Sequence, residues 1–113
     1  MKLVFLFHPV KDLKAALAYY RDTLGYDEAW REGEHTVALR LPGTDVQLMI
    51  EDDELDMGAG GVFLVDSVDA FYEEHKDRLE FVKEPVDIPP GRYAIFRDSS
   101  DNYLRILDFS NER

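Results

Sequence analysis

The fold is decided by a pattern that occurs twice in the chain, as VKDLKAAL at residues 10–17 and as VDSVDAFY at residues 65–72. In each copy an apolar run ends, and Asp12 or Ser67 then stands where a helix N-cap accepts backbone N–H groups. Both copies continue with the apolar spacing of an amphipathic helix. The predicted apolar faces consist of Leu13, Ala16, Leu17, Tyr20 and Leu24 in the first copy and of Val68, Phe71, Tyr72, His75 and Leu79 in the second. Gly25 is expected to end the first helix.

Strand-like runs surround each predicted helix. The first helix follows a short apolar run at residues 3–7, and the second follows one that ends near Val65. Three further runs follow each helix, at residues 28–31, 36–41 and 45–50 and at residues 81–86, 93–97 and 103–109, with turn sequences between them. The sequence therefore predicts an α+β fold, in which two βαβββ modules form a cupped, partly closed mixed sheet with the helices outside. We expect one domain, with module one at residues 1–52, a charged and glycine-rich linker at 53–59, and module two at 60–113.

Composition narrows the possible functions. The 113 residues have room for one domain, and 45% hydrophobic with 33% charged residues is ordinary for a globular protein. The 24 acidic and 13 basic residues give a net charge of −11, which argues against nucleic-acid binding. Cysteine is absent, so disulfides and thiolate chemistry are excluded. Because the N-terminal run is too short for a signal peptide and no run approaches the ~18 residues of a membrane span, we expect a cytoplasmic protein that binds no membrane.

Four short motifs point to a known family. They are VKDL at residues 10–13, AYYRDTLG at 18–25, FLVDS at 63–67 and FRDSSDN at 96–102. Together with the repeat they resemble the vicinal oxygen chelate superfamily, which includes glyoxalase I, the fosfomycin- and bleomycin-resistance proteins and the extradiol dioxygenases. The resemblance covers nearly the whole chain. It implies paired βαβββ modules that form a cupped sheet with a site inside the cup, and, in the metal-dependent members, metal ligands at four inward positions.

The residues at those four positions are unusual for the family. Carried across by the motifs, the positions hold Phe5, Gln47, Gly60 and Arg105. Only the glutamine can act as a ligand, and a permanently charged guanidinium repels a divalent cation. We therefore predict no metal at the family site and no cofactor. Strand alternation places further residues on the same faces, so the predicted ligand-binding residues are Phe5, Phe7, Gln47, Met49, Gly60, Val62 and Arg105.

Arg105 has two interpretations, because an arginine in an otherwise apolar strand needs a partner or a route to water. It either anchors a ligand carboxylate or phosphate or forms an internal ion pair. We interpret His8, His35 and His75 as polar or packed side chains rather than metal ligands. The aromatic residues Trp30, Tyr93 and Phe96 are expected to belong to the core, with a pocket wall or a dimer interface as alternatives.

Three functions follow from these observations. The first is metal-free binding of a small molecule in the cup, as in the bleomycin-resistance branch. The alternative is a family enzyme (a lyase, isomerase or dioxygenase) with a displaced metal site or none, and the sequence leaves open whether a reaction is catalysed. A third possibility is an interaction module whose cup is filled by its own side chains. The family likeness also leads us to expect a homodimer.

Overall fold

The N-terminal part of the chain forms one strand, a helical segment and three further strands. A computed structural model describes residues 1–53 and 58–111. Its first elements are β1 (Lys2–Pro9), α1 (Leu13–Leu17), the π-helix η1 (Ala18–Thr23), β2 (Glu28–Glu32), β3 (Thr36–Arg40) and β4 (Gln47–Glu51). The strands are ordered β2-β3-β4-β1, with β1 parallel to β4 and the other neighbours antiparallel. Residues Val4–Ala59 make up this N-terminal unit.

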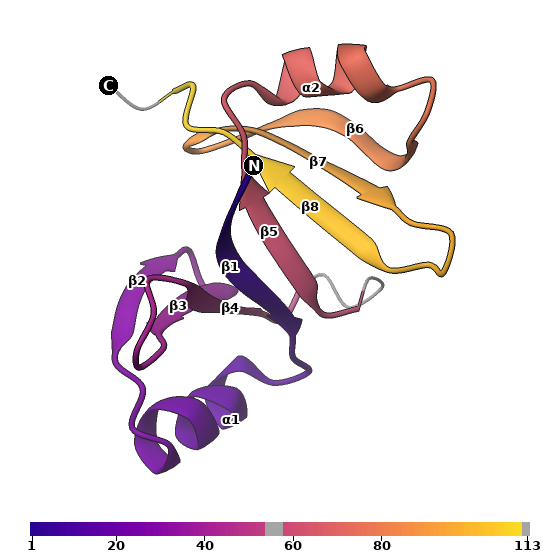
Figure 1. Ribbon diagram of the computed structural model, residues 1–113. Coiled ribbons are helices and arrows are strands. Elements are labelled where there is room, and N and C mark those ends of the chain that lie inside the picture. The colour runs from indigo at the N-terminus through magenta and orange to yellow at the C-terminus, as the bar shows by residue number, and fades with distance from the viewer. Residues whose placement is uncertain (54–57, 112–113) are drawn as a thin grey trace. The chain divides into compact units, whose positions relative to one another are not determined.

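The C-terminal part repeats that arrangement. It contains β5 (Gly60–Leu64), α2 (Val68–His75), β6 (Glu80–Ile88), β7 (Gly91–Arg97) and β8 (Tyr103–Leu107). The strands are ordered β6-β7-β8-β5, and here β5 is parallel to β8 (Figure 1). This C-terminal unit consists of Gly60–Arg113 together with Met1–Leu3. The predicted α+β class, the mixed pairing and the twofold βαβββ order are confirmed.

The helices begin where the caps were predicted. A carboxylate oxygen of Asp12 accepts the Ala15 amide at 3.1 Å, and Oγ of Ser67 accepts the Ala70 amide at the same distance. Each bond gives an acceptor to a backbone amide that has no partner within the first helical turn. The two copies of the repeat therefore form the same local structure.

The predicted apolar face of the first helix is wrong at Leu24, which is 46% exposed. The helix changes to π-helical bonding, and the Leu24 amide donates to the Tyr19 carbonyl five residues back at 3.0 Å. A wider turn rotates the following residues away from the positions that a 3.6-residue period gives them. Gly25 then ends the helix with φ of 81°, as predicted.

In each unit the helix packs on one face of the strands. The N-terminal core consists of Leu13, Leu17, Val37, Leu39, Leu48 and Ile50. The C-terminal core consists of Val68, Ala94, Phe96 and Ile106, with Leu104 packed against it. Side chains alternate along a strand, so the residues between these core positions lie on the opposite, helix-free face of each unit.

Some predicted boundaries need correction. His8 lies within β1, opposite Ile50, and not in the turn that follows the strand. The last strand ends at Leu107, two residues earlier than predicted, and Asp108 there has a separate role described below. Of the predicted linker at 53–59, residues 54–57 lie outside the described part of the chain.

Candidate functional site

The helix-free face of the N-terminal unit carries four of the predicted ligand-binding residues. Phe5 lies opposite Gln47, and Phe7 lies opposite Met49, in the parallel pairing of β1 with β4. Their chain neighbours, such as Leu48 and Ile50, point to the helix side and belong to the core. Phe5, Phe7, Gln47 and Met49 therefore share one face, as the alternation predicted.

Trp30 belongs to the same face, although the predicted set omitted it. It pairs with Ala38 on β3, which in turn pairs with Met49 on β4. The indole Nε1 donates to Oε1 of Gln47 at 2.9 Å, and the Phe5 ring meets the indole edge-on with centroids 5.7 Å apart. The amide oxygen of Gln47, which was the one donor suited to a metal, is thus engaged by the indole.

The helix-free face of the C-terminal unit carries Arg105. This residue pairs with Val62 on β5 and with Ile95 on β7, and its side chain is fully buried. Leu104 and Ile106, its neighbours along β8, pack on the side of α2. Arg105 therefore lies on the face away from the helix, as predicted, between two apolar side chains that are themselves buried.

Gly60 makes room for the Arg105 side chain. A Cβ atom at Gly60 would lie 3.3 Å from Nη1 of Arg105 and 2.9 Å from the carbonyl oxygen of Tyr103. The second distance is shorter than real Cβ contacts allow, so a larger residue would move the backbone. Gly60 and Arg105, two of the four positions that the motifs carry across, are thus in close contact.

Two more cations lie on the helix-free face of the C-terminal unit. Lys83 pairs with Ile95 across β6 and β7, and its ammonium lies 5.9 Å from the centre of the Tyr93 ring. Arg97 donates to Glu80 at 2.6 Å and approaches Asp101 at 3.5 Å. The hydrogen bond and the charge of Glu80 raise the pKa of Arg97, so this guanidinium stays charged.

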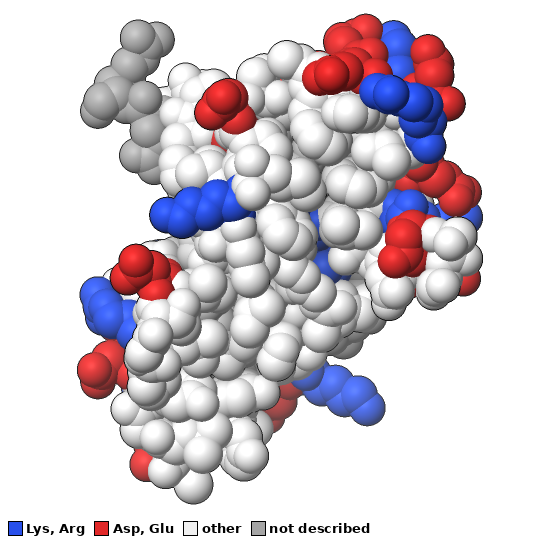
Figure 2. All heavy atoms as spheres, viewed as in Figure 1, with Lys and Arg blue, Asp and Glu red and all other residues white. Residues whose placement is uncertain are grey.

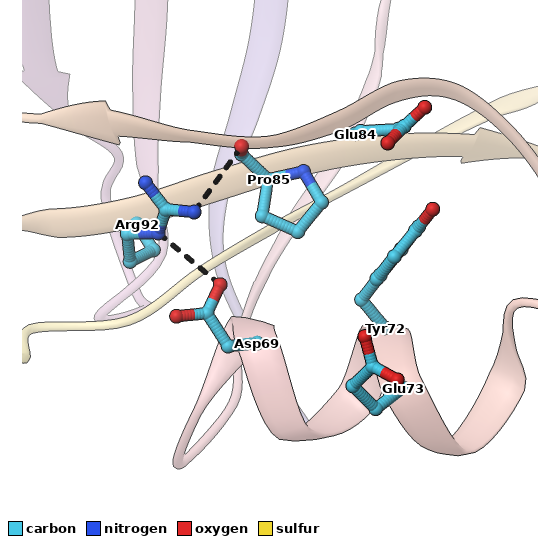
Figure 3. Close-up of a pocket in the computed structure, with 6 residues that line it drawn as sticks. All are labelled: Asp69, Tyr72, Glu73, Glu84, Pro85 and Arg92. Atoms are coloured by element: carbon cyan, nitrogen blue, oxygen red, sulfur yellow. Dashed lines mark hydrogen bonds and ion pairs between the residues drawn. The ribbon is translucent and has the colours of Figure 1, made fainter.

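Three acidic side chains of the C-terminal unit, Asp69, Glu73 and Glu84, lie together on the helix side. A hollow of about 310 Å³ lies between α2 and β6 and is lined by Asp69, Tyr72, Glu73, Glu84, Pro85 and Arg92 (Figure 3). Arg92 bridges its walls, with bonds to Asp69 at 3.2 Å and to the Pro85 carbonyl at 3.3 Å. In Figure 2 acidic and basic side chains are intermixed over α2 and the turn after it, where Lys76 pairs with Glu73.

Sequence reasoning missed Asp108, which organises the start of α2. Its Oδ2 accepts the Val68 amide at 2.8 Å, and its Oδ1 accepts the Arg92 amide at 2.9 Å and the Ser110 hydroxyl at 2.7 Å. Burial raises the pKa of Asp108, but these hydrogen bonds outweigh burial and leave the pKa below its usual value. The signal in the sequence that could have indicated this role is an acidic residue directly after an apolar strand. These bonds tie the start of α2 to β7 and to the segment after β8.

The histidines do not form a cluster. The His8 ring lies 3.5 Å from the Tyr20 hydroxyl, and burial lowers the pKa of His8. His35 contacts the Asp52 carboxylate at 2.6 Å, and that hydrogen bond raises the pKa of His35. His75 packs against the Phe71 ring. Across residues 1–53 and 58–111, no three His, Cys, Asp or Glu side chains are grouped as a metal site would need.

Comparison with known proteins decides the family. The sequence profile of the Glyoxalase/Bleomycin resistance protein/Dioxygenase superfamily matches residues 2–106. The chain belongs to this superfamily. The resemblance seen in the four motifs is thereby confirmed. Among curated proteins none matches the chain.

Solved structures share the fold of this glyoxalase superfamily chain at low sequence identity. One is described as an NAD-dependent benzaldehyde dehydrogenase from Legionella pneumophila (17% identity, 94% of this chain and 98% of that chain, TM-score 0.77). Another is methylmalonyl-CoA epimerase from Mycobacterium tuberculosis (21% identity, 95% and 87% covered, TM-score 0.71). A third is a superfamily member from Vibrio splendidus 12B01 (16% identity, 95% and 97% covered, TM-score 0.69). At these identities the likeness establishes the fold alone.

The four residues that the motifs align with the superfamily's metal positions do not fit a divalent cation. In the strand pairing, Arg105 lies opposite Val62 as Met49 lies opposite Phe7, which differs from the pairing of Gln47 with Phe5. Phe5 and Gly60 offer no donor, and Gln47 already accepts the Trp30 indole. The fourth position holds a buried cation, Arg105, which would repel a metal ion in an apolar setting.

Within the described residues, no helix is long and apolar enough to cross a membrane.

Proposed function

We propose that this superfamily member binds a small molecule without a metal, on the helix-free faces of its strands. The observation that carries the proposal is the fully buried guanidinium of Arg105. The motifs align this residue with a position where the family's metal-dependent members place a metal ligand. A side chain that is always charged cannot coordinate a cation, but it can hold a ligand acceptor through five N–H donors in a fixed fork.

The N-terminal unit supports the proposal with a different chemistry. Phe5 and Trp30 are held against each other, and the indole is fixed by its bond to Gln47. Trp30 is nevertheless 37% exposed. A partly exposed aromatic side chain that is already ordered loses little rotamer freedom on binding, which favours contact with an apolar part of a ligand.

Native mass spectrometry of gently purified protein tests this function. We expect a co-purified organic molecule, which can be released, identified and titrated back. Trp30 is the single tryptophan of the chain, so its fluorescence reports binding at the helix-free face directly. The variant W30F is the matched control, since it should keep the protein folded and remove the signal. A protein that neither carries nor rebinds any organic molecule would contradict the proposal.

We further propose that the chain works as a homodimer. β6 lies at the end of its row of strands and exposes Val82 and Val86, at 38% and 39%. An end strand with exposed apolar residues can pair with or pack on another chain, and natural proteins usually cover such strands. Sedimentation equilibrium at micromolar concentration should give twice the mass of the chain. A clean monomer at that concentration would contradict the dimer.

A further inference from the structure

The two faces of the C-terminal unit differ in their charged side chains. On the helix side, Glu84 and Asp69 line the hollow between α2 and β6, and Arg92 is bonded to Asp69 and Asp87 there. The helix-free side carries Lys83, Arg97 and Arg105, with the carboxylates of Glu80 and Asp101 beside Arg97. The whole chain has 24 acidic and 13 basic residues. Lys83 and Arg105 therefore form a row of two cations on this face of an acidic protein.

The three cations differ in their partners and in their positions on the strands. Arg97 is engaged by Glu80 and Asp101 at the end of β7. Lys83 and Arg105 lie in one row across the strands, with Ile95 between them, because both pair with that residue. Each also interacts within the chain, and the Arg105 side chain is fully buried. An anion that binds Arg105 must therefore displace side chains that cover it and exchange with its present partners. Their shared feature is position, since both point to the same helix-free face.

The surroundings of Arg105 strengthen an ionic contact. Val62 and Ile95, its neighbours across the strands, are fully buried and apolar. Opposite charges attract more strongly in such a setting than in water. Nη1 lies against the backbone at Gly60, which limits the movement of the guanidinium. A fixed planar fork suits a carboxylate or phosphate, which it can bind through two parallel hydrogen bonds.

We infer that the ligand of this protein is an anion, whose carboxylate or phosphate group is bound by Arg105 with Lys83 as a second cation. The inference rests on the proposed small-molecule binding and narrows it to one chemical class. Carboxylate and phosphate present the same chemistry to a guanidinium, so the experiment must separate them.

Calorimetric titration with three probes tests the inference. The probes are inorganic phosphate, benzoate, and benzamide as the neutral counterpart of benzoate. We expect one of the two anions to bind the wild-type protein, and benzoate, if it is that anion, to bind at least tenfold more tightly than benzamide. Binding of phosphate or of benzoate shows whether the anionic group of the ligand is a phosphate or a carboxylate. Failure of both anions to bind would overturn the inference.

Variants then locate the site. R105M should weaken anion binding by about thirtyfold or more, as when one side of a buried charge pair is removed. K83M should weaken it by about fivefold or less, as expected for a less buried charge. R78M is the matched control, because it removes one positive charge from the exposed surface after α2, and it should leave the affinity unchanged. Equal anion affinity in R105M and wild type would overturn the inference.

Two further outcomes keep the conclusions separate. If R105M does not fold, R105K keeps the charge but loses the planar fork, and it should still bind the anion more weakly than wild type. Unchanged affinity in both R105K and K83M would contradict the inference. If the co-purified molecule proves neutral and binds R105M as well as wild type, the anionic class is wrong while the proposed small-molecule binding stands.

Discussion

The two units share one topology but present different helix-free faces. In the N-terminal unit the row across the strands runs from Trp30 through Ala38 and Met49 to Phe7, and every member is apolar. In the C-terminal unit the corresponding row runs from Lys83 through Ile95 and Arg105 to Val62. The two units therefore share their backbone pairing and their apolar helix-side cores, while their helix-free faces differ, one being aromatic and the other carrying Lys83 and Arg105.

The difference shows which constraints the duplicated fold imposes. Side chains beneath the helices must be apolar in both units, because they form the cores. The helix-free positions have no such common requirement, and they are where a ligand chemistry can be built. Substitutions at matched positions of the two units should therefore have unequal effects.

The first prediction concerns two equivalent carboxylates at the ends of β4 and β8. The amides of Asp52 and Asp108 donate to the carbonyls of His35 and Arg92, each at 3.1 Å, so the backbones match. Their side chains do not, because Asp108 is buried and bonded to the Val68 amide, whereas Asp52 contacts His35. We expect D108A to lose about 2–4 kcal/mol of unfolding free energy, because it leaves several buried N–H and O–H donors without an acceptor. D52A should lose much less, and urea denaturation of both variants measures the contrast.

The pH dependence of the D108A effect follows from the lowered pKa of Asp108. A carboxyl group with a depressed folded-state pKa stabilises fully above its unfolded pKa of about 4, and that stabilisation is lost as pH falls through the folded value. The gap between wild type and D108A should therefore be constant from about pH 7 to 5 and narrow below about pH 4. A gap that widens in acid would contradict this assignment.

The second prediction compares Phe5 with Gly60, which occupy the same position in the two units. Since a Cβ at Gly60 would press on the Tyr103 carbonyl and on Arg105, G60A should cost about 1–3 kcal/mol of stability. It should also weaken anion binding by moving the guanidinium. The control is G58A, where a new Cβ meets nothing within 4 Å. Equal stability of G60A and wild type would show that the Gly60–Arg105 contact is loose.

A third and smaller effect is expected at Trp30. W30F removes the hydrogen bond to Gln47 but keeps an aromatic ring near Phe5. Because the bond is exposed, the loss of stability should be about 1 kcal/mol or less. Affinity for phosphate or benzoate should not change if the anion binds only the C-terminal unit. Loss of anion affinity in W30F would show that the two faces act on the same group of the ligand.

The smallest effect separates two histidines of the N-terminal unit. Contact with Asp52 raises the pKa of His35, and burial lowers the pKa of His8. The His35–Asp52 contact therefore stabilises fully below the ordinary histidine pKa of about 6.5, and this stabilisation is lost as pH rises through the raised value. Ring-proton titration by NMR should place His35 above and His8 below that value, and D52N should return His35 toward it.

The sequence predicted the architecture because the signals that determine it are local. The caps at Asp12 and Ser67 and the alternating strands each depend on a few neighbouring residues. The face of Arg105 followed from the same alternation. Leu24 was misplaced because the change to π-helical bonding shows no distinct residue pattern in the helix.

Features that join distant parts of the chain were not predictable in this way. Asp108 accepts a bond from Val68, 40 residues earlier, and Trp30 donates to Gln47 on another strand. The position of Lys83 opposite Ile95 also depends on irregular pairing in β6. Such pairings are set by tertiary structure, and an alternating pattern alone does not reveal them.

We propose that Phe5, Gln47, Gly60 and Arg105 stand where metal-dependent members of the superfamily place their ligands, so that this protein binds its ligand without a metal. The decisive experiment is elemental analysis of protein purified without chelator, with the same sample analysed for bound organic molecules. We predict far less than one transition-metal ion per chain together with an organic ligand. A content near one Zn, Ni, Mn or Fe per chain, retained after dialysis, would contradict the account.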